Sequence, residues 1–221
     1  MERVFPNLYR FTEEPYHRGR KYHYLIVRKD GNLLIPTAGA SLSKYFAEIE
    51  KLGGISKQLI CHWHDAKGEH INEVSRYFGA KLYHHHADGP KLEEKVGTVC
   101  PIDEFGDEGL DMGTGFKAFY FPGHTPGHTI YHWESRGRYY LFTSHVVHLV
   151  EANWELWFNP IKLRHLGPDQ FKYLVDLPIT HALPSVAKYG REEYHQFNDY
   201  TRKTFATAIR SILRKATASR K

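Results

Sequence analysis

The chain has 221 residues, 41% of them hydrophobic, which is enough for the core of one large α/β domain. No stretch approaches the roughly 20 apolar residues that a membrane-spanning helix requires, and the first residues, MERVFPNLYRF, lack the features of a secretory signal peptide. We therefore expect a cytoplasmic protein without a membrane span.

The cysteine and histidine content limits the chemistry of any metal site. The chain has only two cysteines, Cys61 and Cys100, which excludes a disulfide framework and fits a reducing compartment. It has 16 histidines, many more than a core of this size needs. A metal site in this chain must therefore use imidazole and carboxylate ligands, and imidazole binds zinc, iron, copper and nickel.

The formal net charge of +5 raises the question of a nucleic-acid partner. Much of the excess lies in residues 201–221, which hold seven Lys or Arg and no acid. Phe205, Ile209, Ile212 and Leu213 recur at helical spacing, which predicts an amphipathic helix over about 201–218 with a basic outer face. We interpret this helix as docked on the body with its polar face in solvent, so no nucleic acid is expected; contact with an anionic membrane or RNA is the alternative.

Strand-like and helix-like segments alternate along the first half of the chain. The segment NLYRF is predicted to be a strand, and HYLIVRKDGNLLIPTAG a hairpin that turns at Asp30-Gly31-Asn32. A helix is expected in SLSKYFAEIEKLGG, followed by the strand KQLICHWH. The helix HINEVSRYFGA, ended by Gly79, and the strand KLYHHH complete this half.

The second half is predicted to contain more strands than helices. Residues 87–115 are rich in Gly, Asp and Glu and should form loops and short strands, whereas residues 116–147 should form three strands separated by loops at PGHTPGH and ESRGR. A short helix in GPDQFKYLVD, the strand LPITHALP and the terminal helix follow. This alternation predicts an α/β fold, and we expect residues 1–221 to form a single domain.

Two stretches place histidines directly after predicted strands, where α/β proteins keep their functional sites. In HWHDAKGEH, His62 and His64 can turn toward a common point if the strand breaks into a loop. In FPGHTPGHT, two Gly-His turns hold His124 and His128 in a loop that Pro126 stiffens. A turn without a chemical role needs Gly and Pro but not two histidines, so the second stretch is the stronger indication of a site.

The order of these pieces resembles the metallo-β-lactamase superfamily. The similarity runs along most of the chain and includes LLIPTAG, the HWH loop, SRYFGAKLYHHHAD, FPGHTPGHT, LFTSHVV and PITHALP. The resemblance implies a four-layer αββα sandwich with metal ions at the edge shared by its two sheets. The family's motif His-x-His-x-Asp-His makes His62 and His64 the first two metal ligands, and His124 matches the third.

The resemblance assigns two further ligand positions and indicates that two ligands of the family motif are missing. The family's bridging aspartate falls on Ser144-His145 and its last histidine on His181, so both histidines are candidate metal ligands. The motif's Asp and final His fall on Ala66 and Lys67, and an ammonium at this position also repels a cation. We therefore expect one divalent ion, with zinc as the first choice and iron as the second, and no second metal.

A local shift of the motif is an alternative. Asp65 then supplies the missing carboxylate and His70 the missing histidine, which restores a two-metal site; Asp65 is also the candidate general base. Without the shift, Asp65 is a helix N-cap and His70 lies on the helix surface. Trp63 is a candidate wall of the pocket or a packing residue, and the resemblance gives His128 a supporting role through hydrogen bonding.

Three functions follow from the resemblance. The first is metal-dependent hydrolysis of a small ester, thioester, lactone or phosphoester by a mononuclear metal-bound hydroxide. The second is a degenerate, non-catalytic family member whose cleft binds a ligand or a partner protein, and the third is a mononuclear iron enzyme of the sulfur-oxidising type. A small-molecule substrate is expected for the enzymes, and the sequence leaves homo-oligomerisation open.

Overall fold

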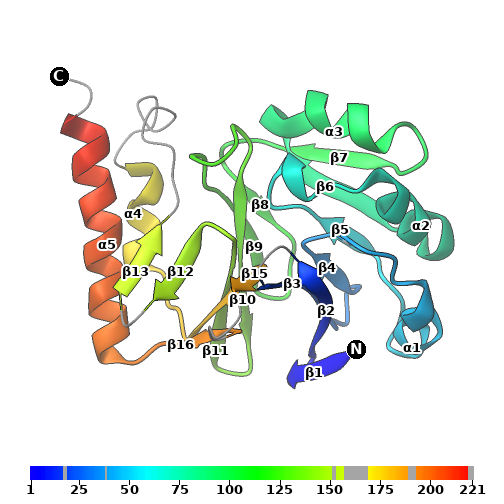
Figure 1. The fold of residues 1–221 in the computed structure, drawn as a ribbon, viewed down its shortest axis with the longest axis horizontal. Helices are drawn as coiled ribbons and strands as arrows, with labels where there is room; N and C mark the ends of the chain where they lie inside the picture. The colour runs from blue at the N-terminus through cyan, green and yellow to red at the C-terminus, as the bar shows by residue number, and fades with distance from the viewer. Residues whose placement is uncertain (17–18, 38, 151–152, 157–168, 189–192, 219–221) are drawn as a thin grey trace.

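The computed structural model describes the chain except residues 17–18, 38, 151–152, 157–168, 189–192 and 219–221. Two stacked β-sheets lie between two groups of helices, and the expected four-layer αββα sandwich is confirmed (Figure 1). The helices outside the first sheet are α1 (Phe46–Lys51), α2 (Gly68–Phe78) and α3 (Gly89–Val96), and those outside the second are α4 (Asp169–Asp176) and α5 (Asp199–Ala218). Within the described residues, no helix is long and apolar enough to cross a membrane.

The first sheet is built mainly from the N-terminal half of the chain. Its order is β1-β2-β3-β4-β5-β6-β7, and β15 pairs with β3. The strands are β1 (Glu2–Phe5), β2 (Leu8–Tyr16), β3 (Gly19–Ile26), β4 (Leu33–Ile35), β5 (Lys57–Leu59), β6 (Lys81–His85), β7 (Ile102–Phe105) and β15 (Val186–Lys188). The run from β4 to β7 is parallel, so these strands end at one edge of the sheet.

The second sheet has the order β16-β14-β11-β10-β9-β8. Its strands are β8 (Leu110–Asp111), β9 (Phe116–Tyr120), β10 (Thr129–Ser135), β11 (Arg138–Ser144), β14 (His181–Pro184) and β16 (His195–Gln196). A separate hairpin consists of β12 (Val147–Val150) and β13 (Asn153–Leu156). The three strands expected over 116–147 are therefore confirmed as β9, β10 and β11.

Helix α3 lies in the segment for which loops and short strands are predicted, so that prediction is wrong here. Pro90 stands in the first helical turn, where a missing backbone N–H costs nothing. Leu92 and Val96 are four residues apart, and both are buried in a cluster beneath the helix. A single pair of apolar residues at helical spacing is too short a pattern to stand out among the surrounding acids and glycines.

The terminal helix α5 covers the second sheet with its apolar side. Phe205 and Ile209 are buried in the cluster that separates this helix from the sheet. Trp154 of β13 packs against Phe205, and its indole N–H donates to the carbonyl of Thr201 at 2.9 Å. The contacts fix the helix against the body of the protein.

Buried aromatic side chains from both sheets fill the space between them. Tyr24, Phe116, Tyr131 and Phe142 are each at most 1% exposed. The two sheets are also tied by hydrogen bonds at one edge: Tyr131 Oη donates to the carbonyl of Ile60 at 2.6 Å. Just beyond β5, the N–H of Thr129 donates to the carbonyl of Cys61 at 2.7 Å. The loops that follow β5 and precede β10 therefore meet at this edge.

Candidate metal centre

The first histidine loop begins where β5 ends. His62 is extended, and the single 3-10 turn Trp63–Asp65 then reverses the chain, so that the N–H of Asp65 donates to the carbonyl of His62 at 3.0 Å. The turn brings Asp65 Oδ2 to 3.2 Å from His62 Nε2. The prediction of a strand through His64 is wrong in this detail, because the strand stops at Leu59 and leaves the histidines on a turn.

The second histidine loop connects β9 to β10 and faces the first loop. Gly123 has a φ of 139°, a conformation that residues with a Cβ rarely adopt, and this turn presents His124. His124 Nε2 lies 3.0 Å from His64 Nδ1, and the rings of His62 and His124 have their centroids 4.7 Å apart. Two loops that are 60 residues apart in sequence therefore bring three imidazoles together.

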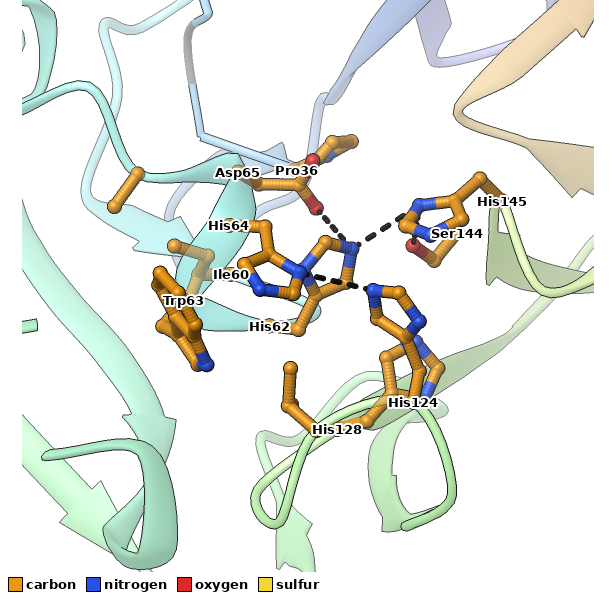
Figure 2. A network of polar contacts seen from close by, with 12 residues as sticks. Pro36, Ile60, His62, Trp63, His64, Asp65, His124, His128, Ser144 and His145 are labelled. Carbon is orange, nitrogen blue, oxygen red and sulfur yellow. Dashed lines mark hydrogen bonds and ion pairs between the residues drawn. The ribbon is translucent and has the colours of Figure 1, made fainter. Parts of the chain in front are cut away.

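A fourth imidazole comes from the end of β11. Ser144 has a φ of 56°, which is unusual for a residue with a side chain, and the resulting turn directs His145 into the cluster. His145 Nδ1 lies 3.1 Å from His62 Nε2. Figure 2 shows that the side chains of His62, His64, Asp65, His124 and His145 point toward one another.

Burial favours the neutral form of two imidazoles of this cluster, those of His62 and His145. It lowers the pKa of His62 well below its ordinary value, and it lowers the pKa of His145 to about 4. Burial opposes ionisation of Asp65, but the neighbouring His62 and the ammonium of Lys21 outweigh it and hold the pKa of this carboxyl well below its usual range. Neutral imidazole and ionised carboxylate are the forms that bind metal ions.

The donor atoms of the cluster are spaced as the ligands of a divalent ion are. Ligand atoms that lie ~2.0 to 2.1 Å from zinc in a tetrahedral site are about 3.3 Å apart, and the neighbouring donors here are 3.0 to 3.2 Å apart. His62, His64 and His124 form one group with ligand atoms within 4.8 Å of one another, and His62, Asp65 and His145 form another. Asp65 Oδ2 is buried and lacks a hydrogen-bond partner among the described residues, which suits an atom whose partner is a cation.

Two candidate ligands are not brought to this cluster. His181 is the first residue of β14 and pairs with Tyr140, whereas the end of β14 that reaches the level of Ser144 is Pro184. The ring of His181 packs instead against Phe5 and Tyr140. His70 lies on α2, where its ring nitrogens are 3.4 Å from Glu69 and 3.9 Å from Glu73. The shifted motif therefore brings Asp65 to the cluster but not His70.

The two positions at which the family motif is lost contribute no donor to the cluster. Ala66 is buried among the apolar side chains beneath α2 and α3. Lys67 is exposed and precedes α2. The N-cap prediction for Asp65 is wrong, because helix α2 begins at Gly68 after Lys67 and the Asp65 carboxylate instead faces His62 and Lys21.

His128 and Trp63 border the cluster. His128 Nδ1 lies 2.9 Å from the carbonyl of Phe121, and its ring stacks on that of His62 with centroids 5.4 Å apart. Because burial lowers the pKa of His128 to about 3, it supports its loop as a neutral donor. The indole of Trp63 packs on His64 at a centroid distance of 3.8 Å, on the side away from His145 (Figure 2).

Sequence reasoning missed Asp88, which joins the two ligand loops. Its carboxylate is 2% exposed and accepts hydrogen bonds from the N–H of Trp63 at 3.0 Å and from Thr125 Oγ1 at 2.8 Å through Oδ2. Its Oδ1 accepts from the N–H of Gly127 at 2.8 Å. An Asp shortly after the strand KLYHHH is the only sequence feature that points to it, because the partners are distant in sequence.

A second group of potential ligands, His85, His86 and Asp107, lies where β6 and β7 end. His85 Nδ1 accepts from the N–H of Ala87, so the proton of its neutral ring is on Nε2 and is donated to Asp107 Oδ1 at 3.1 Å. The ring of His85 also stacks on Tyr120 with centroids 4.1 Å apart. These contacts explain the group as a hydrogen-bonded support for the loop.

The layers, the sheet order and the position of the histidine loops define a metallo-β-lactamase fold. A metallo-β-lactamase from Pontibacter korlensis is 16% identical with a TM-score of 0.66 over 96% of this chain and 97% of that one. A B3 metallo-β-lactamase with an active-site glutamic acid is 21% identical with a TM-score of 0.62 over 99% of this chain and 90% of that one. No protein-family model matches the chain.

A sequence relative agrees with the fold. The hydroxyacylglutathione hydrolase of Wigglesworthia glossinidia brevipalpis is 29% identical over 153 residues, which are 67% of this chain and 58% of the relative. The chain thus spans less than two thirds of the length of that relative. The chain has the metallo-β-lactamase fold, and its sequence similarity to this hydrolase agrees with the superfamily that the order of its motifs resembles.

Proposed function

We propose that the chain is a metal-dependent hydrolase with one divalent ion, zinc before iron, held by His62, His64 and His124. The observation that carries this proposal is the convergence of imidazole nitrogens at 3.0 to 3.1 Å from three separate loops. His145 supplies a further imidazole, and Asp65 supplies the carboxylate. A purely structural role does not explain why four imidazoles from three loops are gathered around one point, where His62 is buried, His124 and His145 are half-buried and His64 is exposed.

The donor set favours a mononuclear centre. The superfamily motif places ligands of a second ion at positions that here hold Ala66 and Lys67, and neither residue offers a donor to the cluster. When bound, the ion supplies Lewis acidity and lowers the pKa of water so that hydroxide forms near neutral pH.

The chain's own residues have distinct roles in this proposal. Asp65 is a weak proton acceptor because its pKa is held low, so we assign its Oδ2 to facing the metal ion beside His62 and not to the role of general base. Asp88 keeps the loops of His64 and His124 at a fixed separation through its hydrogen bonds to both. Trp63, next to His64, forms one wall of the substrate site.

The substrate class is a small ester, thioester, lactone or phosphoester. The curated relative is named for the hydrolysis of hydroxyacylglutathione, so this compound is the first substrate to test. We propose further that residues 1–221 act as one domain in the cytoplasm on a small molecule, without a nucleic-acid partner. The docking of α5 through Phe205 and Ile209 supports the single domain.

One observation favours a second candidate, a mononuclear iron enzyme. His62, Asp65 and His145 form a group of two imidazoles and one carboxylate. This ligand set is typical of non-haem iron(II) oxygenases. It fits the alternative of a mononuclear iron enzyme that oxidises sulfur compounds. Identification of the metal separates the two candidates, since the hydrolase is expected with zinc.

The experiment that tests the proposal is the metal content of purified protein after exhaustive dialysis, in moles per chain, with hydrolysis assays on the four substrate classes. We expect about one zinc per chain, and loss of both metal and hydrolysis in folded His62→Ala and His124→Ala variants. His70→Ala, a histidine outside the cluster, is the matched control and should keep both. Full metal content in the His62 and His124 variants contradicts the assignment, and failure to take up zinc or iron favours the non-catalytic alternative, in which the cleft binds a ligand or partner.

A further inference from the structure

We propose that the ammonium of Lys21, paired with Asp65 and bordered by Glu13 and His23, is a built-in substitute for a second metal ion. The inference deepens the proposed function, on which its meaning for the reaction rests. It explains how a centre that has lost the usual second-metal ligands keeps a positive charge beside its carboxylate.

Lys21 is a buried charge in the middle of a sheet. It lies on β3 and is only 4% exposed, which is rare for a lysine unless an anion compensates its charge. Its Nζ is 3.2 Å from Asp65 Oδ1, and Asp65 is also 4% exposed. The other oxygen of the same carboxylate, Oδ2, faces His62 Nε2 at 3.2 Å. Asp65 therefore stands between the ammonium and the proposed metal ion.

A second carboxylate approaches the same ammonium. Glu13 on β2 is directly opposite Lys21 in the antiparallel pairing of β2 with β3. A Cβ at Gly39 would lie 2.9 Å from Glu13 Oε2 and 3.2 Å from Lys21 Nζ, so both atoms border the same point. The imidazole of His23 and the charge of Lys21 lower the pKa of Glu13, so this side chain is ionised. Glu13 Oε2 is buried and has no hydrogen-bond partner among the described residues.

An imidazole completes the surroundings of the ammonium. His23 Nε2 lies 3.6 Å from Glu13 Oε2, and its Cε1 is 3.1 Å from the same Gly39 position. Two carboxylates and one imidazole are a donor set that binds divalent cations. In this chain, an ammonium that is covalently part of β3 contacts one of these donors, Asp65, and borders the same point as the other two. The cation is therefore permanent and carries one positive charge rather than two.

The arrangement has a consequence for metal stoichiometry. A second ion beside the first would need Asp65 Oδ1, which Lys21 holds, and it would be repelled by the ammonium. Removing the ammonium should expose the donors around it to an external ion. The Lys21→Ala variant should thus bind one more zinc ion per chain than the wild type does.

The test is a zinc titration against a chromophoric chelator, reported as moles bound per chain, for the wild type and Lys21→Ala. The expected result is a gain of one equivalent in the variant, which the added substitution Glu13→Gln should abolish. Lys67→Ala is the control, because Lys67 is an exposed lysine of the same loop region and its removal should add no zinc. Equal stoichiometry in Lys21→Ala and the wild type overturns the proposal.

The outcome is separable from that of the proposed function. The wild-type value tests the metal centre, whereas the difference between variant and wild type tests Lys21, even if the wild type binds no zinc. If metal-free Lys21→Ala does not fold, the proposal predicts that excess zinc restores the circular dichroism spectrum of the native protein, because a ligand that binds only the folded state stabilises it. A variant that stays unfolded in excess zinc also overturns the proposal.

Discussion

Replacement of Asp88 by asparagine tests whether this residue holds the two histidine loops together. The amide side chain in Asp88→Asn keeps one acceptor oxygen. When this oxygen takes the place of Oδ2, it still accepts from Trp63 and Thr125. The NH2 group then faces the N–H of Gly127, from which it cannot accept a hydrogen bond. One charge-assisted hydrogen bond is then lost and the other two become neutral. Since a hydrogen bond to a charged group contributes ~1.5 to 3 kcal/mol, Asp88→Asn should lower the free energy of unfolding by about 2 to 3 kcal/mol.

The assay is urea denaturation of the metal-free protein, paired with a zinc affinity measurement. Because Asp88 positions both ligand loops without touching the metal itself, zinc affinity should fall about 10- to 100-fold. Asp107→Asn is the matched control: Asp107 is 61% exposed and contacts His85, so both quantities should stay near wild type. A loss of stability below about 0.5 kcal/mol together with unchanged zinc affinity in Asp88→Asn would refute the reasoning.

Three further changes give simple outcomes. Tyr131→Phe removes the buried bond to the Ile60 carbonyl and should cost about 1 to 2 kcal/mol in urea denaturation, so an unchanged midpoint contradicts the coupling of the sheets. Gly127→Ala places a Cβ 2.8 Å from the backbone nitrogen of Asp88 and should weaken zinc binding, whereas unaltered binding shows that the loop can shift freely. Burial lowers the pKa of His132, so the folded state holds this ring neutral. Below pH ~6.5 the unfolded chain binds a proton that the folded state does not, and the free energy of unfolding falls by up to about 1.4 kcal/mol per pH unit. His132→Gln should therefore flatten the decline in unfolding free energy between about pH 7.5 and 5.5, and parallel curves for the two proteins contradict this.

The parts of the site that sequence reasoning found are those that depend on local pattern. His62 and His64 follow directly from an apolar strand, and His124 lies in a loop whose Gly and Pro residues mark a turn. The alternation of strands and helices was likewise enough to indicate α/β layers. Each of these features is encoded within a few neighbouring residues.

The parts that sequence reasoning missed depend on contacts between distant segments. The resemblance assigns the family's last histidine to His181, but the register of β14 against β11 puts Pro184, not His181, beside Ser144. Lys21 reads as an ordinary lysine in a strand, because its partners Asp65 and Glu13 lie on other segments. Strand register and charge pairing across sheets are set by the whole fold, so a pattern within one segment does not reveal them.

The most direct test of the metal centre is X-ray absorption spectroscopy at the metal edge of protein loaded with one equivalent of zinc. We expect nitrogen and oxygen ligands only, outer scattering from three or four imidazoles, and no neighbouring metal. Scattering from a second metal at roughly 3.5 to 4 Å, the separation in two-metal sites, or the absence of imidazole scattering, would contradict a mononuclear centre built on these histidines.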